Sequence, residues 1–426
     1  MNKTYYPRLD ETVLRETLPN GLRLCIVPKP QHVKKYAFFA THYGGMDVRF
    51  SLDGEKYNTP AGIAHYLEHK MFDTEEGNAL QELAKNGAEP NAFTSNEITG
   101  YYFDCTEHFE ENLRILLSFV SVPYFTAESV EKERGIIGQE IRMVEDNPEW
   151  QVYEQMMQLL YKEHPARIPV AGSVESIAEI TPELLYACHK AFYAPGNMVL
   201  CVVGDVDAER VREIAMEILP SESGAKIERD HGTGETAAAA EPVRSREMEV
   251  SMPQFLSGFK CEAACEGEEM MRSILIGDMA CDVLLGDSSA LYQRLYDAQL
   301  INGSFGASFD VLSGAAYLYA GGDSNDPQQV HDAILEEAAR IAREGVDETL
   351  YEQTRRAGFG QSLRALNSFE SIAVSLAEGT FRGFDPNRFP ELYDSIEKSD
   401  IETFIRENIV AERAVLSVID PKEDDQ

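Results

Sequence analysis

The sequence has no long apolar run, and this excludes a protein that spans a membrane with helices. No stretch approaches the roughly 20 consecutive apolar residues that a helix needs to cross a bilayer. The opening residues, MNKTYYPRLDETVLRETLPNG, also lack the short apolar core of a secretion signal. We therefore predict a chain that has no membrane span and stays in the cytoplasm.

Positive charge is scarce. The chain has 38 Lys and Arg against 73 Asp and Glu, which gives a formal net charge of -35 at pH 7. Such an acidic protein repels both phosphate backbones and anionic lipids, so neither nucleic acid nor a membrane is expected as a partner. The hydrophobic content of 43% is ordinary for a globular protein, and 426 residues are enough for two or more domains with sizeable cores.

Closely spaced cysteine pairs of the C-x-x-C type are also missing. The chain has seven cysteines, an odd number. This usage predicts free, buried thiols in a reducing compartment such as the cytoplasm. Cys261 and Cys265 could bind a metal, but no histidine lies nearby, and we interpret both as small core residues.

The most informative segment that is present is HYLEH at residues 65–69. On an α-helix, His65 and His69 lie one turn apart on the same face and can bind one metal ion. Glu68 lies on nearly the same side, where it can take a proton from an activated water without being a ligand. H-x-x-E-H is the inverted zincin pattern. The alternative is an amphipathic helix with two core histidines that ordinary hydrogen bonds satisfy.

A site with two histidines needs a third protein ligand. Residues 130–144, VEKERGIIGQEIRMV, predict a helix whose apolar stripe also contains Glu133 and Glu140. A carboxylate on a buried face is costly unless it is paired or bound to a metal. Glu140 is therefore the predicted third ligand, beside His65 and His69, of one Zn²⁺ per chain. Glu133 is predicted to support catalysis by orienting a ligand or the substrate. The alternative is that one of the two carboxylates pairs with Lys or Arg.

The chain divides into two halves that end alike. Residues 221–245, SESGAKIERDHGTGETAAAAEPVRS, have almost no large apolar side chain and predict a linker between domains at 1–220 and 246–426. Each half ends with an amphipathic helix followed by an apolar strand, at 198–203 and at 414–419, which indicates an internal duplication. Alternating strands and helices predict an α+β fold in which helices cover one face of each sheet.

Taken together, these motifs resemble those of the insulinase/pitrilysin-type zinc peptidases, the inverted-zincin group that includes mitochondrial processing peptidase. The resemblance spans most of the chain and rests on LPNGLR at 18–23, HYLEH at 65–69, NAFTS at 91–95, the E-x-x-x-x-x-x-E spacing at 133–140, GSVESI at 172–177 and the segment YAPGNM to VGD at 193–205. It implies two duplicated domains, each a mostly antiparallel sheet, that close as a clam-shell chamber around a peptide. Only the first half has H-x-x-E-H and can be catalytic, and the chain is most similar to bacterial catalytic subunits of the family.

The resemblance also assigns a substrate-binding strand. In the family, an equivalent strand binds the peptide backbone as an added edge strand. Between the turn KNGAEP and the apolar strand at 100–105, the sequence is predicted to be extended. The predicted substrate-binding residues are Asn91, Ala92, Phe93 and Thr94, with Asn91 closest to the scissile carbonyl.

One segment departs from the family pattern. Members of the family usually bring an Arg and a Tyr of the second domain to the substrate, but at 288–303 the expected Arg position is Tyr296 and the expected Tyr position is Gly303. Arg294 is close in sequence but faces another side of a helix. In the family, such a pattern is typical of heterodimers in which a metal-free paralogous subunit supplies the missing pair. We therefore expect a heterodimer of this kind or a homodimer.

The sequence thus predicts a zinc-dependent endopeptidase that hydrolyses short or unfolded peptides, either in peptide processing or in degradation. The alternative is a non-catalytic peptide-binding or scaffold subunit of a peptidase complex. The complete set of site residues at positions 65, 68, 69 and 140 favours the enzyme, because a scaffold has no need of all four. Only the segment 288–303 favours the scaffold.

Overall fold

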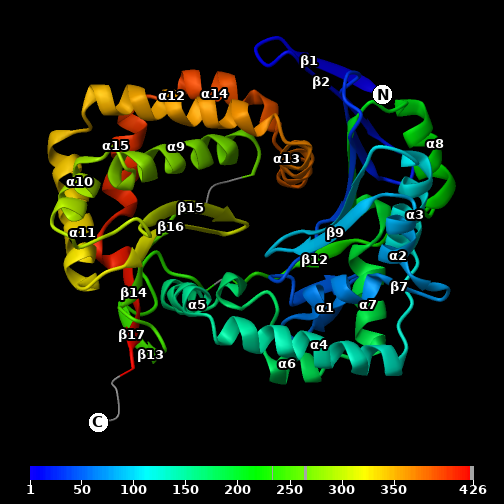
Figure 1. Ribbon diagram of the computed structural model, residues 1–426, viewed down its shortest axis with the longest axis horizontal. Coiled ribbons are helices and arrows are strands. Elements are labelled where there is room, and N and C mark those ends of the chain that lie inside the picture. Colours follow the sequence, from blue (N-terminus) through cyan, green and yellow to red (C-terminus); the bar gives the residue numbers. More distant parts are fainter. Residues whose placement is uncertain (233, 263–265, 423–426) are drawn as a thin grey trace. The chain divides into compact units, whose positions relative to one another are not determined.

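The computed structural model describes all residues except 233, 263–265 and 423–426, and the chain forms two compact units (Figure 1). Each unit is assembled from three separate segments of sequence. Unit 1 consists of residues 1–141, 169–230 and 363–387. Unit 2 consists of residues 142–168, 231–362 and 388–426.

Unit 1 is built on a seven-stranded sheet with the order β1-β2-β3-β11-β4-β10-β9. Neighbouring strands are antiparallel except β3 and β11, which are parallel. The strands of this sheet are β1 (Asn2–Tyr6), β2 (Glu11–Thr17), β3 (Arg23–Pro28), β4 (Lys35–Thr41), β9 (Glu89–Thr94), β10 (Thr99–Cys105) and β11 (Met198–Gly204). Two small sheets contain β5 (Arg49–Leu52), β6 (Glu55–Asn58) and β12 (Ile227–Arg229), and β7 (Asp73–Thr74) and β8 (Gly77–Asn78). The helices are α1 (Ile63–Met71), α2 (Ala79–Lys85), α3 (Phe109–Ser121), α6 (Val174–Ala178), α7 (Pro182–Phe192), α8 (Ala208–Ile218), α13 (Phe369–Arg382) and most of α4 (Ala127–Glu145).

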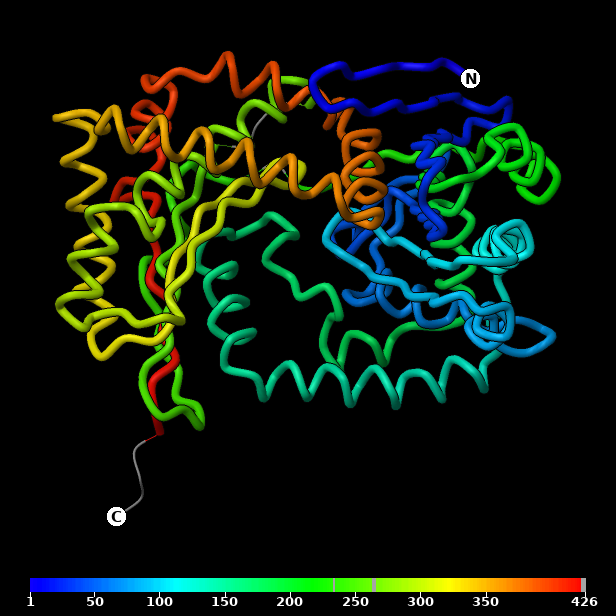
Figure 2. Tube along the Cα trace, turned by 45° about the horizontal axis from the view of Figure 1, so that its top comes forward, coloured from blue at the N-terminus to red at the C-terminus, as the bar shows by residue number. Residues whose placement is uncertain are grey.

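Helices cover both faces of this sheet. On one face, Leu200 of β11 belongs to a large core with α1, α3, α7 and α8. On the other face, Cys201 of β11 and Phe38 of β4 form a second core with Leu376 of α13, the orange helix beside the blue strands in Figures 1 and 2. We predicted helices on one face only. β11 has the sequence MVLCVVG, which is apolar on both faces, so each face needs an apolar partner, and all seven of its residues are buried.

Unit 2 is built on a five-stranded sheet with the order β13-β17-β14-β16-β15, in which only β13 and β17 are parallel. Gly258 of β14 faces Met156 of α5, and the neighbouring Ser257 hydrogen-bonds His331 of α11 at 2.7 Å. Because adjacent residues of a strand point to opposite faces, α5 and α11 cover opposite faces of this sheet. The helices and strands of unit 2 are α5 (Pro148–Leu160), β13 (Val243–Met248), β14 (Gln254–Cys261), α9 (Glu268–Leu285), α10 (Ala290–Asp297), β15 (Gly306–Leu312), β16 (Ala315–Asp323), α11 (Pro327–Glu344), α12 (Glu348–Ala365), α14 (Phe389–Ser395), α15 (Lys398–Asn408) and β17 (Ala414–Pro421).

The two sheets repeat one topology. The order β3-β11-β4-β10-β9 in unit 1 has the same succession of one parallel and three antiparallel pairs as β13-β17-β14-β16-β15 in unit 2. α13 packs on β11, and α5 packs on β17, which is the equivalent strand. The predicted α+β class, with two duplicated and mostly antiparallel sheets, is confirmed. A closed chamber stays a prediction.

The predicted domains at 1–220 and 246–426 are continuous in sequence. In the structure, each compact unit instead includes one helix that comes from the other half of the sequence. α5 precedes the predicted linker but belongs to unit 2, and α13 follows it but belongs to unit 1. Each of these helices therefore buries its apolar face on the sheet of the other half of the sequence.

The predicted linker, 221–245, is partly built into the units. It contributes β12, which pairs with β5, and the first residues of β13, which pairs with β17. Between these strands, the Glu235 carboxylate accepts hydrogen bonds from the backbone N–H groups of Lys162 (2.7 Å) and His164 (2.9 Å) and pairs with Lys260 at 2.6 Å. A lack of large apolar side chains did not exclude strands here, because strand pairing uses the backbone.

Two predictions from the sequence concern the cysteines, expected to be free and buried, and the helices, expected not to span a membrane. Six cysteines are free and buried, and Cys265 lies outside the described residues. Within those same described parts of the chain, no helix combines the length and the apolar character needed to cross a membrane. The cytoplasmic location stays a prediction.

Candidate metal centre

Helix α1 presents the two histidines of HYLEH on one face. The rings of His65 and His69 have centroids 4.7 Å apart and are inclined by 71°. Tyr66 and Leu67 are fully buried and fix the opposite face of the helix in the core. The Tyr66 hydroxyl also donates a hydrogen bond to the carbonyl oxygen of Val130 in α4, so the helix that carries the histidines is joined directly to the helix that carries Glu133 and Glu140.

A glycine sets the start of α1. Gly62 precedes the first turn and has a φ of 89°, which residues with a side chain rarely adopt. A Cβ atom at this position would lie 2.4 Å from the carbonyl oxygen of Ala171. The helix can therefore begin at this place only with glycine.

We expect Gly62→Ala to lower the unfolding temperature by several degrees, because it forces both a strained φ and a clash, with a cost of about 1–3 kcal/mol. Gly135→Ala is the matched control. Gly135 lies within α4 with no atom near its Cβ position, so alanine there should be neutral or stabilise the helix by about 0.5–1 kcal/mol. Thermal unfolding followed by circular dichroism compares the two. Equal unfolding temperatures would contradict the role given to Gly62.

Glu140 of α4 completes a cluster with the two histidines. One of its carboxylate oxygens lies 3.6 Å from Nε2 of His65, and the other lies 3.6 Å from Nε2 of His69. One potential ligand atom from each residue lies within 4.8 Å of the others, and no second cluster of this kind occurs among the residues that the structure describes. The structure thus brings together the three residues that were predicted as metal ligands.

The donor set fits Zn²⁺. Two imidazole nitrogens and one carboxylate oxygen are a ligand set that zinc takes in hydrolases, and three protein ligands keep a fourth position for water or substrate. Burial lowers the pKa of His65 to about 4, so this ring is neutral near pH 7, and the neutral form is the one that binds a metal. Glu140 is half-exposed and supplies the negative charge that the cation needs.

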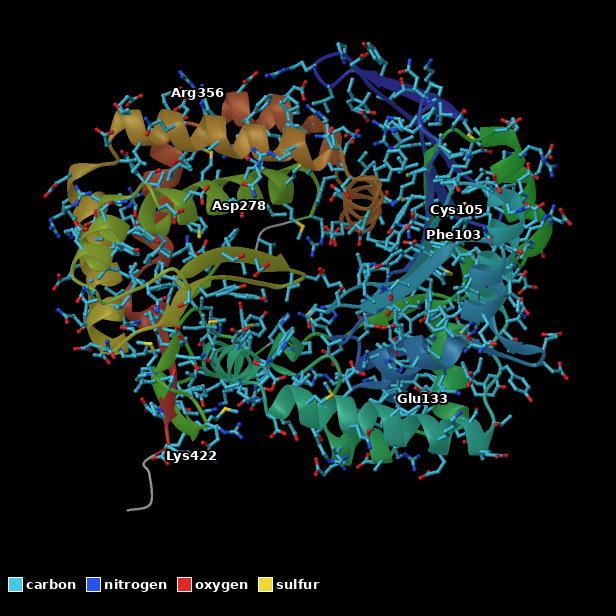
Figure 3. All side chains as sticks on the ribbon, viewed as in Figure 1. Phe103, Cys105, Glu133, Asp278, Arg356 and Lys422 are labelled. Atoms are coloured by element: carbon cyan, nitrogen blue, oxygen red, sulfur yellow. The ribbon has the colours of Figure 1, made fainter. Side chains whose placement is uncertain are left out.

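Glu133 orients one of the histidines. Glu133 lies on α4, where Figure 3 labels it. Its Oε1 lies 3.0 Å from Nδ1 of His69, so the N–H of that nitrogen can be donated to the carboxylate while Nε2 faces Glu140. Burial alone would lower the pKa of His69, but the hydrogen bond to Glu133 and the charges of the nearby glutamates outweigh it, and the pKa is raised. Nδ1 of His65, in contrast, is buried without a hydrogen-bond partner within the described chain.

Glu68 lies on the same helix as the two histidines but is not part of the cluster. Its side chain is 8% exposed, and this burial raises the pKa of its carboxyl group. The Thr94 hydroxyl donates a hydrogen bond of 2.7 Å to Oε2 of Glu68. A buried carboxylate with a raised pKa, beside a set of metal ligands, has the properties of a general base.

The predicted substrate-binding residues lie on β9, the terminal strand of the seven-stranded sheet. Asn91 is exposed, and Ala92 and Phe93 pack against the cores on the two opposite faces. Thr94, at the end of the strand, reaches Glu68. β9 pairs with β10 alone among the described strands, so its other edge can accept an extended peptide.

Two contacts around the site were missed by reasoning from the sequence. Thr94 was expected to bind substrate, and its hydrogen bond to Glu68 was not anticipated. The bond from Tyr66 to Val130 was also missed. A tyrosine within an apolar stripe is the one signal that could have indicated the second contact, because a buried hydroxyl needs a partner.

The segment that departs from the family pattern lies in unit 2. Arg294 of α10 forms an ion pair of 2.9 Å with Glu337 of α11, whose side chain is 5% exposed. Tyr296 and Gly303 are both exposed. Arg294 therefore shares a buried carboxylate of its own unit with Arg340, which pairs with Glu337 at 2.7 Å.

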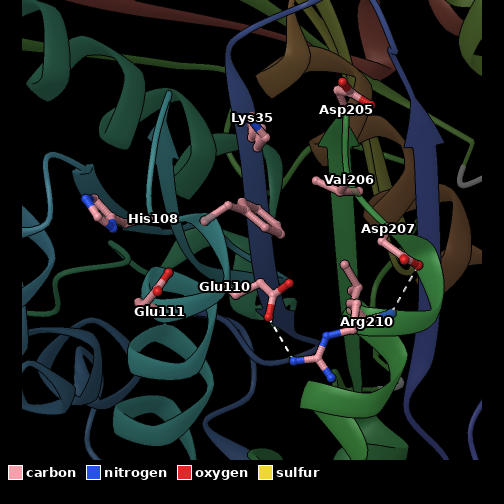
Figure 4. Close-up of a pocket in the computed structure, with 10 residues that line it drawn as sticks. Lys35, His108, Glu110, Glu111, Asp205, Val206, Asp207 and Arg210 are labelled. Carbon is pink, nitrogen blue, oxygen red and sulfur yellow. Dashed lines mark hydrogen bonds and ion pairs between the residues drawn. The ribbon is translucent and has the colours of Figure 1, made fainter.

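A separate cavity of about 510 Å³ lies between the first turns of α3 and α8 (Figure 4). Three of its charged groups already have partners. Arg210 pairs with Glu110 at 2.9 Å, and Asp207 caps α8 by accepting hydrogen bonds from the backbone N–H groups of Glu209 and Arg210. Asp207 is thus engaged in capping α8, and the groups suited to catalysis are those of the histidine cluster.

Models of two protein domains match most of the chain. Residues 53–174 match the model described as insulinase (peptidase family M16), and residues 179–357 match the one described as the peptidase M16 inactive domain. The first match contains His65, Glu68, His69, Glu133 and Glu140, which agrees with a catalytic centre in the first half only.

Individual proteins are similar over almost the whole chain. YmfH of Bacillus subtilis, named as an uncharacterized zinc protease, is 38% identical over 423 residues, which cover 98% of each protein. YmxG of the same organism, named in the same way, is 26% identical and covers 84% of this chain and 86% of its own length. An M16-like peptidase of Alicyclobacillus acidocaldarius has a similar structure, with a TM-score of 0.93 at 31% identity, covering 98% of this chain and 100% of that one. The chain therefore belongs to the insulinase family, peptidase M16.

Proposed function

We propose that this protein is a zinc-dependent endopeptidase that hydrolyses short or unfolded peptides. The observation that carries the proposal is the cluster of His65, His69 and Glu140, with the buried carboxylate of Glu68 on the same helix. The zinc proteases among its relatives support the same chemistry.

The residues of the site have different roles in hydrolysis. Zn²⁺ held by His65, His69 and Glu140 would supply the acidity that activates water and polarises the peptide carbonyl. Glu68 accepts the proton of the attacking water and delivers it to the leaving amine, which its raised pKa favours. Glu133 keeps the His69 ring in one orientation through Nδ1.

The form of the substrate follows from the edge strand. A peptide that adds to β9 must offer an extended backbone with unpaired N–H and C=O groups. Folded proteins rarely present such a segment, so short or unfolded peptides are the proposed substrates. Enclosure of the peptide in a chamber, and a role in peptide processing or degradation, belong to the same proposal.

A partner subunit is also part of the proposal. At 288–303 the chain lacks the usual Arg and Tyr, and the neighbouring Arg294 is held by Glu337 within unit 2. We therefore propose a heterodimer with a metal-free paralogous subunit that supplies the missing pair, or a homodimer.

The experiment that tests the function is digestion of a diverse peptide mixture by the purified, zinc-loaded chain, with the products read by mass spectrometry. We expect new peptide ends, their loss after treatment with 1,10-phenanthroline, and their return when zinc is added back. The isomer 1,7-phenanthroline, whose two nitrogens cannot chelate one metal ion, is the control and should have no effect.

Each other result has a distinct meaning. Cleavage that survives removal of zinc would contradict the proposed chemistry. The absence of products from the zinc-loaded chain would contradict an enzyme that acts alone and would favour a subunit that requires its partner, or the alternative role of a peptide-binding scaffold.

A further inference from the structure

We propose that Thr94 is a positioning residue that holds the carboxylate of Glu68, so that the strand that binds the peptide also sets the orientation of the general base. The inference rests on the proposed peptidase function. It differs from the expectation that the Thr94 side chain contacts the substrate.

The first observation is the contact itself. The Thr94 hydroxyl donates to Oε2 of Glu68 at 2.7 Å, and no other described residue makes a hydrogen bond to that carboxylate. A glutamate has three rotatable side-chain bonds, so a carboxylate without this bond has several orientations available. The single hydrogen bond therefore decides which oxygen of Glu68 remains available to accept a proton.

The second observation is that Thr94 is itself fixed. It is the last residue of β9 and pairs with Thr99 of β10. The Thr99 hydroxyl donates to the carbonyl oxygen of Tyr43 at 2.9 Å and lies 3.4 Å from the Thr94 hydroxyl oxygen. A threonine on a loose loop could not orient a carboxylate, whereas this one stands on a paired strand.

The turn that follows Thr94 is held on two sides. The backbone N–H of Gly45 donates to the carbonyl oxygen of Ser95 at 2.9 Å. On the other side, Glu97 forms an ion pair with Arg382 of α13, and both side chains are largely buried. The turn is thus fixed from the first half of the sequence and by a helix from the second half, so Thr94 has little freedom to move away from Glu68.

The geometry separates a positioning role from a binding role. Loss of the hydroxyl should leave the backbone of β9, which pairs with the peptide, unchanged. It should therefore lower kcat with little change in KM, whereas a residue that binds the substrate directly raises KM when it is removed. A misplaced catalytic group costs up to about 100-fold in rate.

The experiment compares three variants in the zinc-loaded protein. Thr94→Val removes the hydroxyl at nearly constant volume, and we expect kcat to fall about 10- to 100-fold while KM stays within about twofold. Thr94→Ser keeps the donor, and kcat should return to within about threefold of the wild type. Thr41→Val is the matched control, because the buried Thr41 hydroxyl donates to a backbone carbonyl in the same unit and does not contact Glu68.

A second measurement does not depend on activity. Crystal structures of the wild-type protein and of Thr94→Val should show the Glu68 carboxylate rotated or disordered in the variant only. An unchanged carboxylate, or an increase in KM at constant kcat, would overturn the proposal. If the wild-type chain by itself cleaves no peptide, an enzyme that acts alone is excluded, and the two structures still decide whether Thr94 positions Glu68.

Discussion

Replacing Glu68 by glutamine should abolish peptide hydrolysis while the protein stays folded and keeps its zinc. The amide cannot accept the proton of the attacking water, and loss of a general base typically lowers the rate by about 10²–10⁴-fold. Glutamine has the shape of glutamate, and its amide oxygen can still accept the hydrogen bond from Thr94. The measurements are kcat on a peptide that the digestion experiment identifies as a substrate, and the zinc content of the purified variant by elemental mass spectrometry.

The control for this variant is Glu76→Gln. Glu76 lies in the exposed turn between β7 and β8 of the same unit, so the change removes one charge without touching the site. Its activity should equal that of the wild type. If purified Glu68→Gln protein were as active as the control, Glu68 would not be the base, and another group would have to accept the proton.

Replacing Glu140 by alanine should remove both zinc and activity. Glu140 supplies the only carboxylate of the cluster, and its two oxygens lie 3.6 Å from Nε2 of His65 and Nε2 of His69. Without it, only the two imidazoles of His65 and His69 remain to hold a divalent cation. Even residues that only support metal ligands contribute about 10–100-fold to affinity, so loss of a ligand should weaken zinc binding by more than about 100-fold. Competition with a fluorescent zinc chelator measures this change.

The matched control is Glu145→Ala, at the last residue of the same helix α4. Glu145 is exposed, so its loss should leave the zinc affinity within about twofold of the wild type. A Glu140→Ala protein that bound zinc as tightly as this control would exclude Glu140 as a ligand. The half-exposed position of Glu140 makes this outcome a real test, because exposed carboxylates are common without a metal.

Reasoning from the sequence reached the cluster because helix periodicity is short-ranged. The spacing of His65 and His69 fixes their common face, and the spacing of Glu133 and Glu140 places both on one stripe of α4. The sequence predicted two carboxylates on a buried face without a cation nearby; in the structure Glu133 is largely buried and Glu140 is half-exposed. To place α1 and α4 side by side, only one further inference was needed, that a buried charge must be paired or bound to a metal.

The exchange of α5 and α13 could not be reached in the same way. An amphipathic pattern shows that a helix has an apolar face, but it does not show which sheet will cover that face. The contact between Thr94 and Glu68 was hidden for a similar reason, because a threonine at the end of a strand is common and its hydroxyl has many possible partners. Both features depend on contacts between residues that are distant in sequence.

The exchange of helices has a consequence for the order in which the protein can be made. When the first half of the chain has left the ribosome, the sheet of unit 1 still lacks α13, and apolar residues such as Phe38 and Cys201 have no helix to cover them. At the same time, α5 has been synthesised before the sheet on which it packs. Neither unit can be completed from a nascent first half. Unit 1 must wait until translation has passed residue 382, at the end of α13, and unit 2 must wait for β17. A messenger truncated between the two halves would therefore yield a product with exposed apolar surface rather than a smaller stable protein.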